Sequence, residues 1–230
     1  MSPAPELDHL VLATPDLGST VAEVAAATGV APAEGGRHVG HGTRNFLYGL
    51  GSSEPGGGSG LGGGAYLEIV GPDPEQPDPE GPRWFGIDTL DGPRLVHWAA
   101  RVDGIAAAVA CARDRGYDPG EPVGMSRRTP DGGSLAWQLT FPQPHGLGGL
   151  LPFLLDWGTA VHPTRRALPQ LPLLVFEAGH PDPGAVRAGL DALGAGAVAP
   201  RVAAAPEPYL RAVVEGRHGP VVLAAGVVRS

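Results

Sequence analysis

Three residues of this chain carry side chains that could together hold a divalent metal ion: His9, Glu68 and His97. Two imidazoles and one carboxylate are a recurrent ligand set that leaves coordination positions open for a substrate. An ion held in this way, such as Zn, Fe, Mn or Ni, acts as a Lewis acid that stabilises negative charge on a substrate oxygen. A single histidine or glutamate in a strand is more often a hydrogen-bonded structural residue. The prediction therefore requires the three side chains to share one surface.

The alternation of side chains along a strand predicts such a surface. In its strand, His9 shares a face with Leu7 and Val11. By the same rule His97 and Glu68 lie on the concave faces of their own strands. The opposite faces, which helices are expected to cover, carry Leu10, Leu12, Leu67, Ile69, Val96 and Trp98. We therefore expect the three polar side chains to point into a common pocket.

Four further residues are expected to line this pocket and bind substrate: His38, Asn45, Arg127 and Trp137. They belong to corresponding regions of two expected hairpins. Arg127 and its neighbour Arg128 could pair with a substrate carboxylate, because a guanidinium binds a carboxylate through two parallel hydrogen bonds. A solvated surface charge is the commoner fate of such an arginine. No catalytic residue is assigned.

The elements that would position these residues begin with a βαβββ unit over residues 5–72. Residues 7–13 predict a strand, and Thr14-Pro15-Asp16 supplies a helix cap and an N1 proline. Apolar residues then repeat at helical spacing until Gly29, a C-terminal stop. Three strands are expected next, at 37–43, 44–50 and 65–70.

The same order recurs over residues 94–158. A strand at 94–102 is followed by a helix that Asp103 caps and Gly116 ends. Further strands are expected at 123–128, 135–141 and 150–156. His9 and His97 precede their helices by the same number of residues, so they occupy equivalent positions. The fold class is α+β, with paired βαβββ modules that form a curved, half-open barrel.

The remaining segments are given structural roles. Residues 168–230 resemble a partial third module, with strands at 171–178, 210–215 and 220–224 and a helix at 183–193. Residues 73–93 form an inter-module linker. The glycine-rich residues 51–64 are expected to be a flexible hairpin loop, because no helix follows them to form a phosphate site. His162 lies in a Gly/Pro-rich turn and is assigned no role.

Composition narrows the class of partner. The chain has 16 Lys and Arg against 24 Asp and Glu, a net charge of -8, with no basic cluster. This argues against nucleic-acid and membrane partners and favours a small-molecule substrate or ligand. The N-terminus lacks a signal core and no apolar run reaches membrane-span length, so we expect a cytoplasmic protein. The single cysteine, Cys111, cannot form an internal disulfide. The chain could also form a homodimer.

Several of these stretches resemble the glyoxalase-like, or vicinal oxygen chelate, superfamily, which includes bleomycin resistance proteins and extradiol dioxygenases. They are Leu7-Asp-His9-Leu-Val-Leu, Pro15-Asp16-Leu17, Gly-Gly-Arg37-His38, Gly42-Thr43-Arg-Asn45, Tyr66-Leu-Glu68-Ile and Arg94-Leu-Val-His97-Trp98. The resemblance covers most of the chain, and its specificity comes from the order of the pieces and the module repeat. In that family the metal ligands come from the first and last strands of paired modules, which implies His9, Glu68 and His97.

One position departs from the family pattern. Relatives often place a fourth ligand in the last strand of the second module, where this chain has Phe153 or Leu154. Asp156 lies nearby, but using it would require a register shift, so it is interpreted as a rim residue. The departure favours a three-ligand open site or a site that binds no metal.

Three functions stay open on this basis. The leading hypothesis is a metal-dependent enzyme of lyase, isomerase or dioxygenase type that acts on a small oxygen-bearing molecule. The alternative is a metal-free protein of the same fold that binds or sequesters a small molecule or drug. A structural or partner-binding domain is the third hypothesis. Resemblance to a family supports a fold more directly than an activity.

Overall fold

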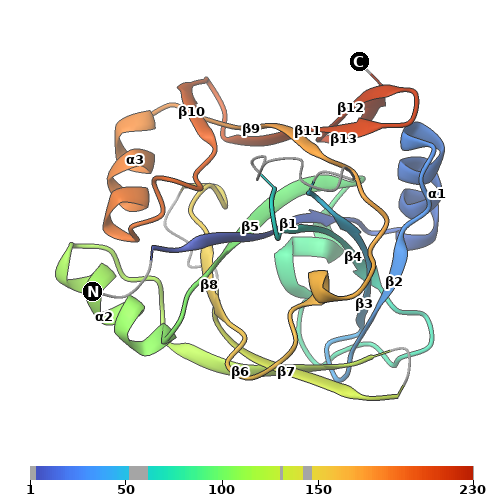
Figure 1. Cartoon of the computed structure of the whole chain (residues 1–230), viewed down its shortest axis with the longest axis horizontal. Coiled ribbons are helices and arrows are strands. Elements are labelled where there is room, and N and C mark those ends of the chain that lie inside the picture. The colour runs from blue at the N-terminus through green and yellow to red at the C-terminus, as the bar shows by residue number, and fades with distance from the viewer. Residues whose placement is uncertain (1–3, 52–61, 130–131, 142–146, 230) are drawn as a thin grey trace.

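A computed structural model describes residues 4–51, 62–129, 132–141 and 147–229. These residues form a closed barrel of eight strands and a separate five-stranded sheet (Figure 1). None of the helices in the described ranges is both long and apolar enough to cross a membrane. The centre of the glycine-rich loop, 52–61, lies outside the described residues, so its flexibility stays a prediction.

The first module has the expected order of elements. It consists of β1 (Glu6–Ala13), α1 (Leu17–Thr28), β2 (Ala33–His38), β3 (Thr43–Gly49) and β4 (Tyr66–Pro72). Helix α1 follows Asp16, whose carboxylate accepts a hydrogen bond from the Ser19 amide at 2.9 Å, and it ends at Gly29 in the left-handed conformation. The cap and the stop are as expected. Pro15 precedes the cap residue, so the predicted N1 proline is wrong.

The second module repeats this order. It consists of β5 (Arg94–Arg101), α2 (Ile105–Asp114), β6 (Pro122–Arg128), β7 (Ser134–Thr140) and β8 (Phe153–Asp156). The predicted Asp103 cap is wrong, because the N-cap position of α2 is occupied by Gly104, which has no side chain to cap the helix. The amides of Gly104 and Ile105 instead donate to Asp156 Oδ2 at 2.9 and 3.0 Å. Asp156, which was expected to be a rim residue, thus caps α2.

Strand order confirms the paired modules. The barrel runs β1-β4-β3-β2-β6-β7-β8-β5, so each module has the same internal order and its first strand is parallel to its last. The modules meet where β1 pairs with β5 and where β2 pairs with β6, at Arg37 and Arg128. The ring is closed where a half-open barrel was expected, because this second contact joins its free edges.

A bulge in β1 changes which side chains face the barrel interior. The register with β5 shifts between Leu7 and His9. Two residues then face one on the partner strand, which interrupts the alternation of faces. Leu7 belongs with Leu10 to the apolar cluster that packs against the helices and the C-terminal sheet, so its predicted place on the same face as His9 is wrong. Val11 belongs to a second apolar cluster inside the barrel, as expected.

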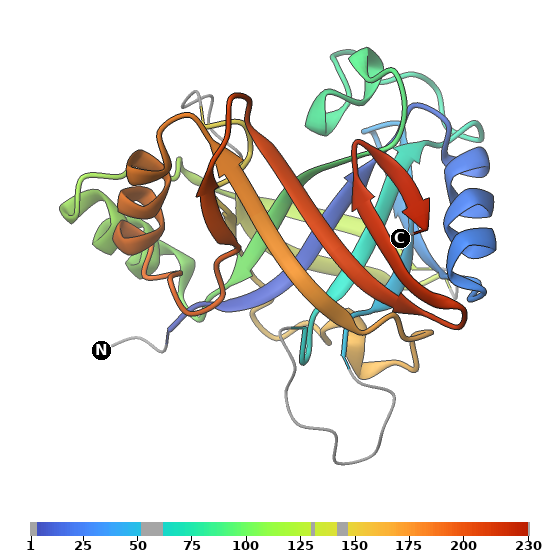
Figure 2. The same ribbon diagram turned by 90° about the horizontal axis from the view of Figure 1, so that it is seen from above.

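The C-terminal segment is not a copy of the modules. Its elements are η2 (Pro163–Arg165), β9 (Leu173–His180), α3 (Pro183–Ala192), β10 (Arg201–Ala204), β11 (Tyr209–Gly216), β12 (Gly219–Ala224) and β13 (Gly226–Arg229). Two of these strands, β10 and β13, were not expected, and the order β10-β9-β11-β12-β13 differs from that of the modules. Figure 2 shows this sheet lying across the outside of the barrel strands. Trp98 of β5 meets Phe176 of β9 edge to face, with ring centroids 5.6 Å apart.

Candidate functional site

A cavity of about 870 Å³ opens inside the barrel. Aromatic side chains form part of its wall: Tyr66, Trp84, Phe85, Trp137, Phe141, Phe153, Trp157 and Tyr209. All seven residues expected at the site line it: His9, His38, Asn45, Glu68, His97, Arg127 and Trp137. Cavities of several hundred cubic ångströms with apolar walls and a few polar groups are typical small-molecule sites. The expected faces of β1, β4 and β5 therefore hold for the three proposed metal ligands.

His9 is held by a carboxylate that the sequence analysis did not single out. His9 Nδ1 lies 2.6 Å from Asp8 Oδ1, and the other oxygen of Asp8 is 2.8 Å from Trp157 Nε1 and 3.0 Å from His162 Nε2. Burial by itself would raise the pKa of Asp8, but the hydrogen bonds with His162 and His9 hold it well below its usual range. An ionised carboxylate only accepts hydrogen bonds, so His9 Nδ1 carries the proton. His9 Nε2 is then the ring nitrogen that faces the cavity.

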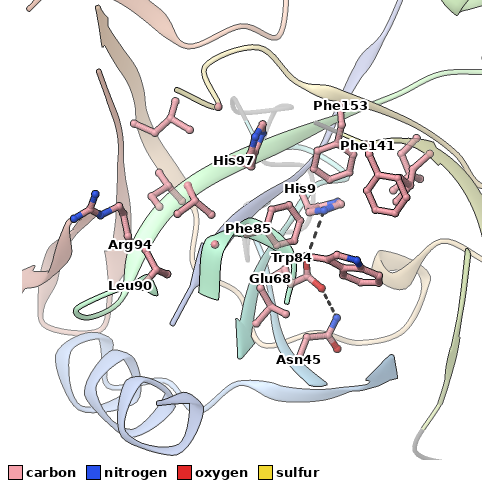
Figure 3. A pocket seen from close by; sticks show the side chains of 18 of the residues that line it. His9, Asn45, Glu68, Trp84, Phe85, Leu90, Arg94, His97, Phe141 and Phe153 are labelled. Atoms are coloured by element: carbon pink, nitrogen blue, oxygen red, sulfur yellow. Dashed lines mark hydrogen bonds and ion pairs between the residues drawn. The ribbon is translucent and has the colours of Figure 1, made fainter. Parts of the chain in front are cut away.

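Glu68 lies beside His9 Nε2. Its Oε2 is 3.7 Å from His9 Nε2, and its Oε1 accepts a hydrogen bond from Asn45 Nδ2 at 2.5 Å (Figure 3). His38 Nε2 is 4.0 Å from the same Oε1. Burial lowers the pKa of His38 to about 4, so this imidazole is neutral at neutral pH. The result is a carboxylate fixed at one oxygen and surrounded by two imidazole nitrogens.

His97 lines the same cavity but stands apart from this group, as Figure 3 shows. Its ring lies 6.0 Å from the rings of Phe85 and Phe153. Its Nδ1 is buried and has no hydrogen-bond partner among the described residues. Burial also lowers the pKa of His97 to about 4. The ring is therefore neutral and can act as a metal ligand.

The donor groups fit a divalent metal ion by type and by strand position. His9 has the arrangement usual for ligating histidines, in which one nitrogen is hydrogen-bonded to a carboxylate and the other is free. His97 offers a buried nitrogen without a partner. As the side chains stand, however, no three His, Cys, Asp or Glu residues in the described part of the chain are grouped closely enough to hold an ion. His9, Glu68 and His97 could hold an ion only if their side chains came closer to one another.

The register identifies what occupies the fourth position. Val11 faces Glu68 between β1 and β4, and Ala99 faces Phe153 between β5 and β8. Val11 and Ala99 each lie two residues after the equivalent histidines, so Phe153 is the counterpart of Glu68. An apolar ring thus stands at the position equivalent to Glu68, where the resemblance implies a fourth ligand.

Arg127 is a buried cation in the cavity wall. It is 5% exposed, and its Nη1 has no hydrogen-bond partner among the described residues. Burial lowers the pKa of its guanidinium, while Tyr66 and Glu68 raise it. Guanidinium groups stay charged in proteins. Arg127 is therefore not the solvated surface charge that arginines more commonly are.

Sequence reasoning missed Asp8, Trp157, His162 and the aromatic pair Trp84 and Phe85 as parts of the site. Asp8 directly precedes His9, and strict alternation placed it on the opposite face. The aromatic pair belongs to η1 (Trp84–Thr89), in a segment that was interpreted as a linker. The signal that could have identified Trp84 and Phe85 is that they are two adjacent aromatic residues within a stretch rich in Pro and acidic residues.

Comparison with known proteins places the chain in a family. Residues 7–194 match the model of the glyoxalase-like domain family, so the chain belongs to that family and the resemblance to the vicinal oxygen chelate superfamily is confirmed. No match was found among curated protein sequences.

Three solved structures are similar to this chain, and the one with a TM-score above 0.5 supports the fold. A hypothetical protein from Staphylococcus aureus superposes with a TM-score of 0.59 at 14% identity, covering 96% of this chain and 86% of that one. A methylmalonyl-CoA epimerase in complex with methylmalonyl-CoA is 24% identical, with a TM-score of 0.47 over 70% of this chain and all of that one. The epimerase from Mycobacterium tuberculosis is 19% identical, with a TM-score of 0.39 over 66% of this chain and 88% of that one. Similarity at this level concerns the fold alone.

Proposed function

We propose that this protein is a metal-dependent glyoxalase-like enzyme of lyase, isomerase or dioxygenase type, which acts on a small oxygen-bearing molecule bound in the barrel cavity. His9, Glu68 and His97 would hold the ion. The observation that carries the proposal is the hydrogen bond of 2.6 Å that His9 Nδ1 donates to Asp8 Oδ1, which leaves His9 Nε2 free beside Glu68. A divalent ion at these groups would supply Lewis-acid stabilisation of negative charge on a substrate oxygen.

The residues of the chain prepare the site for that chemistry. Asp8 selects the tautomer of His9 and restrains its ring, and Asn45 holds one oxygen of Glu68. Aromatic side chains lie beside the polar groups in the cavity wall, and a substrate that displaces water from the cavity would strengthen electrostatic interactions there. The proposal requires His97 and Glu68 to approach each other when an ion binds.

A metal-free small-molecule binding protein is the second candidate. Two observations favour it: Phe153 occupies the position equivalent to Glu68, and the described side chains do not converge on an ion position. In this case the cavity would bind its ligand through the aromatic wall and the buried polar groups alone.

Thermal unfolding of chelator-treated protein with added Zn, Mn, Ni or Fe(II) separates the two candidates. Binding to the folded state alone stabilises it by about 2.7 kcal/mol when the ion is at a hundredfold excess over Kd. For a chain of this size that is a rise in Tm of roughly 5–10 °C. We expect this rise in the wild type and in His218→Ala, which removes an exposed histidine that does not line the cavity.

The separate variants His97→Ala and Glu68→Ala should both lose the metal-induced rise. A wild type whose Tm and metal content respond to none of the four ions would reject the enzyme proposal in favour of the binding protein. In that case His97→Ala and Glu68→Ala would change stability equally with and without metal, through a cavity or an unpaired polar group.

A further inference from the structure

Two N–H donors in the cavity wall are buried without a partner. Arg127 Nη1 and Trp137 Nε1 have no hydrogen-bond acceptor among the described residues. A buried donor that is not satisfied destabilises the fold by about 1–3 kcal/mol, and more when it is charged. Such groups are retained where a ligand completes them, which makes the pair a candidate recognition site.

The two residues lie on neighbouring strands and share one face of the sheet. In the β6–β7 ladder, Met125 is opposite Trp137 and Arg127 is opposite Leu135. Arg127 and Trp137 are therefore diagonal neighbours on one face, and both line the cavity. At such positions long side chains can reach a common partner.

The space for the guanidinium is provided by Gly36 of β2. A Cβ atom on Gly36 would lie 2.5 Å from Arg127 Nη1. The same Cβ would overlap the backbone oxygen of Arg128, so any other residue here would displace the β6 backbone as well as the guanidinium. Arg127 is thus accommodated within the barrel wall. An arginine exposed to solvent would not need this space.

The groups around Arg127 do not neutralise it by direct contact. Glu68 is near enough to raise the pKa of Arg127, but its carboxylate is engaged by Asn45 and directed toward His9. The described residues contain no ion pair to Arg127 within 4.0 Å, and the other charged group that acts on it is the cation Arg166. His38 is neutral at neutral pH. The missing partner of the guanidinium is therefore an anion.

We infer that Arg127 and Trp137 form a carboxylate subsite and that the ligand of the cavity is an organic acid with an apolar body. The inference rests on the cavity of the proposed function and names its ligand class. The acid group accepts hydrogen bonds from Arg127 and Trp137 Nε1, and the apolar body packs on the aromatic wall. One cation balances the single charge of a carboxylate, whereas a phosphate dianion would bury uncompensated charge.

The test measures binding of matched probes to chelator-treated protein by titration calorimetry. Phenylacetate, phenylpyruvate and phenylacetamide share an aromatic body, and the amide lacks the charge. Hydrogen bonds to charged groups contribute about 1.5–3 kcal/mol, so the wild type should bind phenylacetate about tenfold or more tighter than phenylacetamide. Arg127→Met should abolish this preference, while Arg128→Met, which alters the adjacent exposed arginine, should retain it.

A second variant keeps the inference testable if Arg127→Met fails to fold. Arg127→Lys keeps the charge but loses the planar fork, so it should weaken phenylacetate binding severalfold and leave phenylacetamide unchanged. Three results would overturn the inference: binding of neither acid, an acid preference that survives in Arg127→Met, or tighter binding of phenyl phosphate than of the acids. Because the measurements contain no metal, an acid preference can persist when the metal proposal fails, and the converse also holds.

Discussion

At the scale of single residues, adjacent glycines in β2 decide where two polar side chains of the site lie. A Cβ atom on Gly35 would overlap Asn45 Oδ1, and one on Gly36 would overlap the backbone oxygen of Arg128 as well as approach Arg127 Nη1. Neither glycine has the positive φ that would explain it by backbone conformation. Their role is to leave volume for Asn45 and Arg127.

Gly36→Ala should therefore lower the free energy of unfolding by about 1–3 kcal/mol, as overpacking of a dense site usually does. Gly124→Ala in β6 is the control, because its added Cβ would meet nothing within 4 Å. That control should stay within about 0.5 kcal/mol of the wild type. Urea denaturation measures both values. Equal effects of the two substitutions would show that Gly36 is not constrained by space.

At the scale of elements, a residue from one strand completes the end of a helix. Helix α2 has Gly104 at its N-cap position and therefore no side-chain cap of its own. Asp156 at the end of β8 instead accepts hydrogen bonds from the amides of Gly104 and Ile105. Asp156 Oδ1 also accepts from the Gly158 amide at 2.8 Å. The carboxylate that lies nearest in sequence to the missing fourth ligand thus has a structural function.

Asp156→Ala should destabilise the protein by about 0.5–2 kcal/mol, the range found for lost helix caps. Asp16→Ala, which removes the cap of α1, should cost a similar amount and serves as the reference. Neither substitution should alter the metal-induced rise in Tm or the affinity for phenylacetate. If Asp156→Ala abolished the metal response while Asp16→Ala did not, Asp156 would have to be counted among the metal ligands.

At the scale of the whole molecule, the barrel and the C-terminal sheet share one core. The outer apolar cluster joins Trp98 of β5 and Val24 of α1 to Phe176, Val214 and Leu223 of the C-terminal sheet. The same segment also reaches the cavity, which Pro208, Tyr209, Leu210 and Ala225 help to line. We therefore expect the described parts of the chain to unfold together.

Phe176→Ala should lower the free energy of unfolding by about 3–5 kcal/mol, because it leaves a cavity against Trp98. Leu174→Ala on the same strand is the control, since Leu174 is 41% exposed and should cost far less. Tryptophan fluorescence and far-ultraviolet circular dichroism should report one coincident transition in each protein. Separate transitions for the two probes would show that the sheet and the barrel unfold independently.

Local patterns in the sequence were sufficient for the modules and for the faces of the proposed ligands. The repeat predicts the two βαβββ units, and alternation correctly directs His9, Glu68 and His97 into the barrel. Caps and stops such as Asp16 and Gly29 act within one helical turn, so their signals are legible in the chain. The roles of the three ligands in binding metal stay predictions.

Only the tertiary structure decided the features that depend on contacts between distant segments. The bulge that brings Asp8 to the side of His9 follows from the register between β1 and β5. Closure of the barrel depends on β2 meeting β6, and the cap of α2 comes from β8. Burial of Arg127 depends on volume that a glycine of another strand leaves free. The physical reason is that register, closure and packing volume are set by pairs of segments, whereas periodicity and propensity describe one segment at a time.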